Sequence, residues 1–286
     1  MKKTIVALIS LLVVQASLLS QEKSRDSLPD KPERDAFESS YIIDNPTDLL
    51  FNKKTMEIVI NHRFGTFNGG TNDLIGIWAP SNIRIGVAYA PHERITVGFG
   101  TTKFDRLQDF NWKVGLLKQT RSGRIPVNIS YYGNFVIDAR KKENFALDQH
   151  RYSFFHQVIF ARRFTSTLSM QIAPSISHFN VVDSNMKNDR IAIAFGGRVK
   201  ISPQSSILWD YSQPITRFEI NPDLNNYNNY PGVSLGFEVR TSSHAFQIFI
   251  SNLNGIVPQQ SYVKNENDFF NGDILIGFNI TRLYNF

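Results

Sequence analysis

The chain has 286 residues with 42% hydrophobic and 20% charged side chains, which suits one large all-β unit or two ordinary domains and excludes a disordered chain. It contains no cysteine, which excludes a disulfide framework and the acylated cysteine of a lipoprotein. The net charge of +6 is scattered, without a basic run interleaved with aromatic residues, so no nucleic-acid partner is expected.

Residues 1–20 have a short basic start and an apolar centre. Lys2 and Lys3 precede an apolar run over 5–14, and Ser20 ends a stretch of small residues. This order predicts a Sec-type signal peptide. The apolar run is too short to cross a bilayer as a helix, and no later stretch approaches the roughly 18 apolar residues that crossing requires. We therefore expect export to the periplasm, the outer membrane or the medium.

Residues 21–54 form a charged, proline-bearing stretch that ends in the more apolar SSYIIDNPTDLLF and a short continuation. No clear period runs through it, which distinguishes it from the sequence that follows. We interpret 21–54 as a periplasmic leader or a partial plug, and 55–286 as the main domain.

From Thr55 onward, apolar residues alternate with polar, glycine or basic residues, which is the period of a β-strand with two different faces. In MEIVINHRF, for example, Ile58 and Ile60 take one face while Asn61 and Arg63 take the other. The pattern predicts twelve strands, near 56–64, 82–90, 94–102, 110–119, 126–136, 151–163, 166–177, 189–201, 206–213, 232–241, 244–252 and 273–286.

The links between these strands alternate in length. Short links are expected at 90–93, 120–124, 164–166, 202–204 and 241–243, and longer ones at 65–81, 103–109, 137–150, 178–188, 214–231 and 253–272. This alternation is typical of membrane-spanning barrels, which have tight periplasmic turns and extended external loops. The prediction is therefore an all-β fold, a closed up-and-down antiparallel transmembrane β-barrel of about twelve strands with both termini on the periplasmic side.

Charge placement favours a membrane barrel over a soluble β-sandwich, which would also alternate. Eight basic residues lie on the parity opposite to the apolar one, where lipid contact would cost each roughly 2–4 kcal/mol near the bilayer midplane. They are predicted to line a wet lumen: Arg63, Arg84, Arg94, Lys113, Arg163, Arg198, Lys200 and Arg240. Many other positions of that parity are small, which leaves space that arginines, water or residues 21–54 could fill: Gly86, Gly98, Gly100, Gly115, Ala192, Ala194, Gly196, Gly236 and Gly277.

Aromatic residues gather near the strand ends on the apolar parity, as in the interfacial girdles of membrane barrels. They are Tyr89, Phe110, Tyr152, Trp209, Tyr211, Tyr284 and Phe286. The last strand is expected to pair with the first and close the barrel. Its Tyr284 and Phe286 resemble the C-terminal signal that delivers barrels to the barrel assembly machinery, whereas Arg282, on the lipid parity, departs from that signal and is expected to reach the headgroups.

Five short stretches resemble a family of Bacteroidota outer-membrane β-barrel proteins defined only as a domain of unknown function. They are HRFG (62–65), IRIGVAY (83–89), QVIFARRF (157–164), HAFQIF (244–249) and GFNITRLY (277–284). Ser242 and Ser243 stand where that family usually has a glycine pair. The resemblance covers roughly 36–286 and implies the location and the fold, with no established activity and no residue to carry over as catalytic.

The sequence offers no catalytic, cofactor or metal site. Outer-membrane lipid hydrolases carry a His-x-Ser pair, but none of His62, His156 and His244 has serine two positions on. The oxygen-rich stretches at 44–48 and 265–273 lack the spacing of a calcium loop. A non-enzymatic protein is therefore expected, and a lipid hydrolase is the least favoured alternative.

The basic lumen parity gives the leading functional hypothesis, a porin-like channel or binder for small anionic solutes. The alternative is a structural or docking protein of the envelope that presents its long external loops. Outer-membrane lipid and lipopolysaccharide are the expected surroundings.

Overall fold

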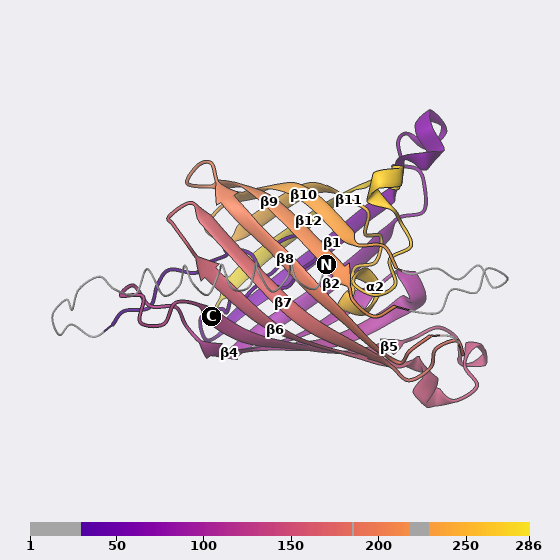
Figure 1. The fold of residues 1–286 in the computed structure, drawn as a ribbon, viewed down its shortest axis with the longest axis horizontal. Coiled ribbons are helices and arrows are strands. Elements are labelled where there is room, and N and C mark those ends of the chain that lie inside the picture. The colour runs from indigo at the N-terminus through magenta and orange to yellow at the C-terminus, as the bar shows by residue number, and fades with distance from the viewer. Residues whose placement is uncertain (1–29, 185, 218–228) are drawn as a thin grey trace.

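The structure is a computed structural model that describes residues 30–184, 186–217 and 229–286. Its strands form one closed barrel in which every neighbouring pair is antiparallel and β12 pairs with β1 (Figure 1). The predicted twelve-stranded up-and-down barrel is confirmed. The strands are β1 (Thr55–Thr66), β2 (Asn82–His92), β3 (Ile95–Thr102), β4 (Leu107–Leu117), β5 (Asn128–Asp138), β6 (Tyr152–Arg163), β7 (Leu168–Phe179), β8 (Asp189–Lys200), β9 (Ser205–Pro214), β10 (Gly232–Arg240), β11 (His244–Ser251) and β12 (Leu275–Asn285).

Helical segments of the described chain are short and lie in the links. They are η2 (Phe67–Asp73), η3 (Phe104–Arg106), η4 (Lys142–Asn144), η5 (Asp148–Arg151), α2 (Pro258–Ser261) and η7 (Phe269–Asn271). Within the described ranges, none is a helix that could cross a membrane. The predicted signal peptide at 1–20 lies outside those ranges.

The two faces of the barrel wall differ as the sequence pattern predicts. On β1, Glu57, Asn61 and Arg63 are buried, whereas on β2 the outward Ile85 is 50% exposed and Val87 40%. Apolar side chains are thus left open on the outside while polar ones are covered on the inside, the reverse of a soluble protein. Of the aromatic residues near the strand ends, Tyr89, Phe110, Tyr211 and Phe286 are among the exposed large apolar side chains.

The links define two rims. The short-turn rim holds Thr55, Asn285 and the links that follow the even-numbered strands β2 to β10, and the long-loop rim holds the others, at the right of Figure 1. The length alternation has one exception, because residues 118–127 at the short-turn rim outnumber residues 103–106 at the long-loop rim. There β4 starts earlier than the sequence pattern indicates, which shortens the loop before it.

Residues 30–54, called the lumen segment below, run from the short-turn rim into the barrel: most of 36–51 is buried inside it, whereas Pro32, Asp35 and Lys53 are exposed at the rim. A tight turn in the segment contacts strands on different sides of the wall: Gln171 of β7 donates to the carbonyl of Pro46 at 2.8 Å, and Asn279 of β12 donates to that of Ile43 at 2.8 Å. Ile42 and Ile43 are almost fully buried in an apolar cluster with wall residues such as Phe155.

Glycines of the wall make room for the lumen segment. A Cβ on Gly196 would lie 2.9 Å from Cδ1 of Ile42, and one on Gly236 would lie 3.2 Å from Cδ1 of Ile43. Both distances are shorter than ordinary carbon contacts, so side chains at these positions would push the segment away. Gly196 and Gly236, two of the small residues that the sequence places on the lumen face, are therefore contact points for the lumen segment.

The link between β11 and β12, residues 252–274, turns back into the barrel from the long-loop rim and is called the inner loop below. Its α2 and the following Tyr262 and Val263 are buried, and these two residues join the same apolar cluster as Ile42 and Ile43. The lumen is therefore filled from both rims.

Candidate functional site

The tip of the lumen segment is a hairpin-like turn. Tyr41 and Pro46 form an antiparallel bridge, and the amide of Ile42 donates to the carbonyl of Asn45 at 3.0 Å. The wall holds this turn through Asp210 of β9, whose Oδ2 accepts the backbone amides of Asp44 and Asn45, each at 2.9 Å. The turn is therefore docked by polar contacts as well as by its two isoleucines.

At the centre of the barrel, Arg63 of β1 is fully buried against this turn. Its Nη2 lies 2.8 Å from Oδ1 of Asp44, its Nη1 donates to Asn279 at 3.0 Å, and its guanidinium lies 4.4 Å from the ring centroid of Phe249. A buried guanidinium is tolerated only when it is paired and hydrogen-bonded. The counter-charge here comes from the lumen segment.

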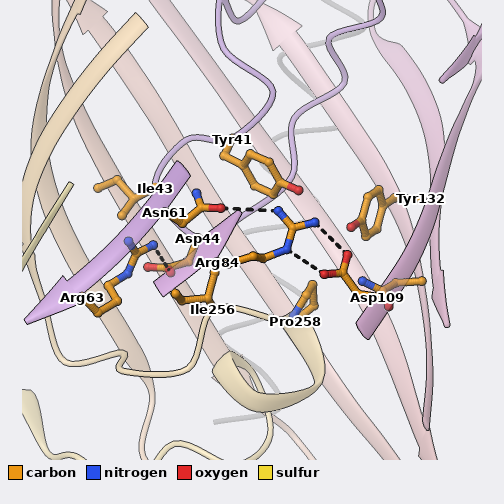
Figure 2. A pocket seen from close by; sticks show the side chains of 11 residues that line it. Tyr41, Ile43, Asp44, Asn61, Arg63, Arg84, Asp109, Tyr132, Ile256 and Pro258 are labelled. Carbon is orange, nitrogen blue, oxygen red and sulfur yellow. Dashed lines mark hydrogen bonds and ion pairs between the residues drawn. The ribbon is translucent and has the colours of Figure 1, made fainter. Parts of the chain in front are cut away.

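Beside it, Arg84 of β2 is paired within the wall. Its Nε and Nη2 each donate to Asp109 of β4 at 2.7 Å, and its Nη1 donates to Asn61 at 3.4 Å (Figure 2). The planar fork of arginine fits a carboxylate in this two-bonded geometry. Arg63, Arg84, Asp44 and Asp109 surround a central cavity of only about 10 Å³.

A second basic cluster surrounds Glu38, nearer the short-turn rim. Lys200 donates to Glu38 at 2.6 Å, Arg198 lies 3.2 Å away and Arg240 3.7 Å away. Burial raises the pKa of Glu38, but the hydrogen bond from Lys200 and the charges of all three cations outweigh it, so the pKa lies below its ordinary value. In the described part of the chain, Arg198 keeps a buried Nε without a hydrogen-bond acceptor.

Lys113 and Asp48 meet at the base of the lumen segment. Lys113 donates to the carbonyl of Leu49 at 3.1 Å, and Asn128 donates to Asp48 at 2.6 Å. Burial raises the pKa of the Asp48 carboxyl to about 6, although the charge of Lys113 opposes the shift. An ionised Asp48 is therefore a cost to docking at neutral pH.

The inner loop meets the lumen segment from the other side. The hydroxyl of Tyr262 donates to Oδ1 of Asn45 at 2.9 Å, and its ring packs edge-on against Phe155 at 5.6 Å. Gln259 donates to Asn134 of the wall at 3.3 Å. The two elements that fill the barrel thus touch directly at its centre.

Two larger cavities lie at the rims. A cavity of about 330 Å³ opens at the short-turn rim, lined by Asp48, Arg94 and Lys118 among others. A cavity of about 150 Å³ opens at the long-loop rim, lined by Arg140, Arg151 and other residues of the loops.

The structure places most of the eight predicted lumen cations inside the barrel. Arg63, Arg84, Lys113, Arg198, Lys200 and Arg240 lie on strands with their side chains in the contacts described above. Arg94 is instead exposed in the turn between β2 and β3, because β2 runs to His92 and only Glu93 and Arg94 connect it to Ile95. Arg163 ends β6 and donates to carbonyls of the turn that follows.

The C-terminal residues lie on β12 at the short-turn rim. Arg282 is exposed, and its guanidinium lies 4.8 Å from the ring centroid of Tyr284. The ring thus holds the arginine at the rim. The use of Tyr284 and Phe286 in barrel assembly stays a prediction.

Sequence reasoning missed the acidic partners of the lumen cations and the inward course of residues 252–274. Two signals were available: Glu38, Asp44 and Asp48 accompany a basic lumen parity, and the long link contains the uncharged stretch GIVPQQSYV (255–263). An uncharged, partly apolar stretch is unusual for a loop that stands in water.

Comparisons with known proteins agree with this geometry. The family model of a membrane bound beta barrel domain (DUF5777) matches residues 37–284. The fold is similar to that of the NanC porin, at 6% identity over 81% of this chain and 99% of that one, with a TM-score of 0.50. It is equally similar to an outer membrane channel from Pseudomonas putida F1, at 9% identity over 82% of this chain and 97% of that one, with a TM-score of 0.50. No curated protein matches the sequence.

Proposed function

Starting from a chain that belongs to the family of membrane bound beta barrel domains (DUF5777), we propose that this protein is a non-enzymatic outer-membrane channel for small anionic solutes. Its lumen segment is a plug that holds the channel closed. The short-turn rim then faces the periplasm and the long-loop rim faces outward, as in other barrels of this membrane.

One observation carries the proposal: most of the lumen cations have their counter-charges on the plug and not on the wall. Asp44 pairs with Arg63 at 2.8 Å, and Glu38 pairs with Arg198 and Lys200 at 3.2 and 2.6 Å. Unpaired ions inside a protein cost several kcal/mol each, so the plug acids stabilise the closed barrel. When the plug leaves, water and passing anions take over their role.

The open lumen would then attract anions. The wall cations Arg63, Arg84, Lys113, Arg198, Lys200 and Arg240 outnumber the wall carboxylates Glu57, Asp109, Asp210 and Glu238. A pore lined by an excess of one charge selects the opposite ion, and the effect weakens as salt screens it.

The test is planar-bilayer recording on the full chain and on the double variant Glu38→Gln/Asp44→Asn. The full chain should conduct little, because its centre is filled. The double variant should open more often, and its reversal potential in a KCl gradient should favour chloride.

A matched control is Glu33→Gln/Asp35→Asn, which removes the same charge from the same segment. Asp35 forms only an exposed pair with Lys118, at 3.1 Å, and Glu33 contacts no lumen cation. This variant should behave like the full chain. A preference for potassium in the opened double variant would refute the proposal.

The second candidate is a structural or docking barrel of the envelope, and the filled centre favours it. The central cavity of about 10 Å³ holds about one water molecule. A protein without residues 30–54 that stays folded but silent in bilayers would support this function, as would capture of a partner without any solute.

Location in the outer membrane, contact with lipopolysaccharide and delivery to the barrel assembly machinery through Tyr284 and Phe286 belong to the same proposal. The exposed apolar band of the strands and the aromatic end of β12 support it. Membrane fractionation with a heat-modifiable gel mobility tests the location. Loss of assembled barrel in Tyr284→Ala/Phe286→Ala, with normal export, tests the delivery.

A further inference from the structure

The cavity of about 150 Å³ at the long-loop rim, called the outer cavity, carries more positive charge than its own acids neutralise. Arg140 takes up both of its carboxylates, at 2.6 Å from Asp138 and 3.2 Å from Asp105. Arg151 and Lys264 also line it, and within the described ranges neither has a carboxylate within ion-pair distance. Three cations against two carboxylates leave one positive charge in excess, and Arg151 and Lys264 are the cations that can share it with an anion from outside.

These two cations are held in place by neutral groups. Arg151 donates to the carbonyls of Asp138 and Arg140 at 2.8 and 3.0 Å, and its guanidinium lies 5.3 Å from the ring centroid of Phe145. Lys264 Nζ lies 4.3 Å from the ring centroid of Phe179. Such contacts with ring faces fix the cation without neutralising it, so its attraction for an anion remains.

Two amide side chains also line the cavity. Gln259 and Gln260 of the inner loop line it, and in the described part of the chain the Oε1 atom of each is buried without a donor. Gln259 itself is 2% exposed. An unsatisfied buried amide oxygen costs about 1–3 kcal/mol, and a ligand hydroxyl group removes that cost once the amide turns its oxygen toward the cavity.

The rest of the lining includes the apolar Leu107, Val136, Phe145 and Val181, together with His150, Tyr152 and Ser153. The volume of about 150 Å³ corresponds to about ten water molecules, and hence to a ligand of about that many heavy atoms. We propose that the outer cavity binds a small hydroxylated organic carboxylate with an apolar body: the carboxylate between Arg151 and Lys264, the hydroxyl at Gln259 or Gln260.

This inference deepens the proposed function, since it names the solute class at the outer mouth of the channel. Lys264, Gln259 and Gln260 belong to the inner loop, whose Tyr262 touches Asn45 of the plug at 2.9 Å. A ligand in the outer cavity therefore contacts the element that fills the lumen from outside.

The test is isothermal titration of the full detergent-solubilised chain with 4-hydroxybenzoate, which has the required carboxylate, ring and hydroxyl. Neutral 4-hydroxybenzamide is the charge control. Binding of 4-hydroxybenzoate at least tenfold tighter than that of the amide is expected, because a charge-assisted hydrogen bond is lost in the amide.

Lys264→Gln and Arg151→Gln should each weaken 4-hydroxybenzoate at least tenfold. Because these residues lie on different elements, loss in both is not explained by a disturbed inner loop alone. Lys142→Gln is the matched control, since Lys142 stands at the same rim, pairs with Asp148 at 3.4 Å and does not line the cavity. It should change the affinity by less than about twofold.

Heat-modifiable gel mobility shows which variants are folded, and affinities are compared only among those. No binding of 4-hydroxybenzoate, equal binding of the amide, or equal weakening by Lys142→Gln would overturn the inference. The readout does not require conduction. Binding in a protein that never conducts would thus refute the channel and keep the site, whereas anion conduction without binding would do the reverse.

Discussion

Arg63 and Arg84 lie side by side in the barrel but depend on different parts of the chain. Arg84 is paired with Asp109 of the wall at 2.7 Å, whereas Arg63 is paired with Asp44 of the lumen segment at 2.8 Å. An ion pair within the wall survives when the lumen segment leaves, but an ion pair between the wall and the segment does not. The comparison teaches that one lumen holds two kinds of charge, one that stabilises the barrel and one that docks the segment.

Breaking the wall pair should have the largest effect. Asp109→Ala leaves the guanidinium of Arg84 buried beside Asn61 without a counter-charge, and removal of one partner of a buried pair costs about 3–5 kcal/mol. We expect a lower midpoint of barrel unfolding in urea, measured by heat-modifiable mobility. Asp44→Ala should lower it far less, because water can reach Arg63 once the segment moves. Equal losses in both variants would contradict the distinction.

Crowding the lumen segment should have an intermediate effect that spares the wall. A Cβ on Gly115 meets Cδ1 of Leu50, while its next neighbour outside Leu50 is 4.0 Å away. Gly115→Val should therefore weaken docking by about 1–3 kcal/mol, as overpacking does. Limited proteolysis in micelles should cut residues 30–54 faster, with an unchanged unfolding midpoint. A lowered midpoint with unchanged cleavage would show that Leu50 stays in place.

The smallest expected effect is a pH dependence at Asp48. Its pKa rises from 3.8 to about 6 on docking, so its contribution to docking is fully present below about pH 4 and is lost as the pH rises through 6. Asp48→Asn keeps an acceptor for Asn128 and removes this cost. At pH 8 we expect docking of the segment to be about 1–2 kcal/mol more stable in the variant than in the unmodified chain, measured as slower proteolytic cleavage. At pH 4 the two proteins should be cleaved at the same rate. The same difference at both pH values would refute this.

Most of the wall could be predicted because its physics is local. The alternation of Ile58 and Ile60 with Asn61 and Arg63 fixes which face meets lipid, and the turn positions fix the strand number. Strand ends were less certain: Arg94 falls in a turn because β2 continues to His92. The alternation of apolar and polar residues does not show where β2 ends.

The filling of the lumen could be predicted only in outline. A basic, glycine-rich lumen parity requires acids and bulk from elsewhere, and residues 21–54 contain both. Which acid meets which cation depends on contacts between residues far apart in the chain, such as Glu38 with Lys200 at 2.6 Å. The inward course of 252–274 has the same origin, since Tyr262 finds Asn45 only inside a closed barrel.

The sequence by itself determined a twelve-stranded barrel with an oily outside and a cationic inside, because side chains of a β-strand alternate between its faces whatever lies across the lumen. Only the tertiary structure decided that this inside is filled, which cations pair within the wall and which with the lumen segment, and where cavities remain. Those outcomes depend on charge pairing and packing between distant segments, which closure of the barrel brings within reach of one another.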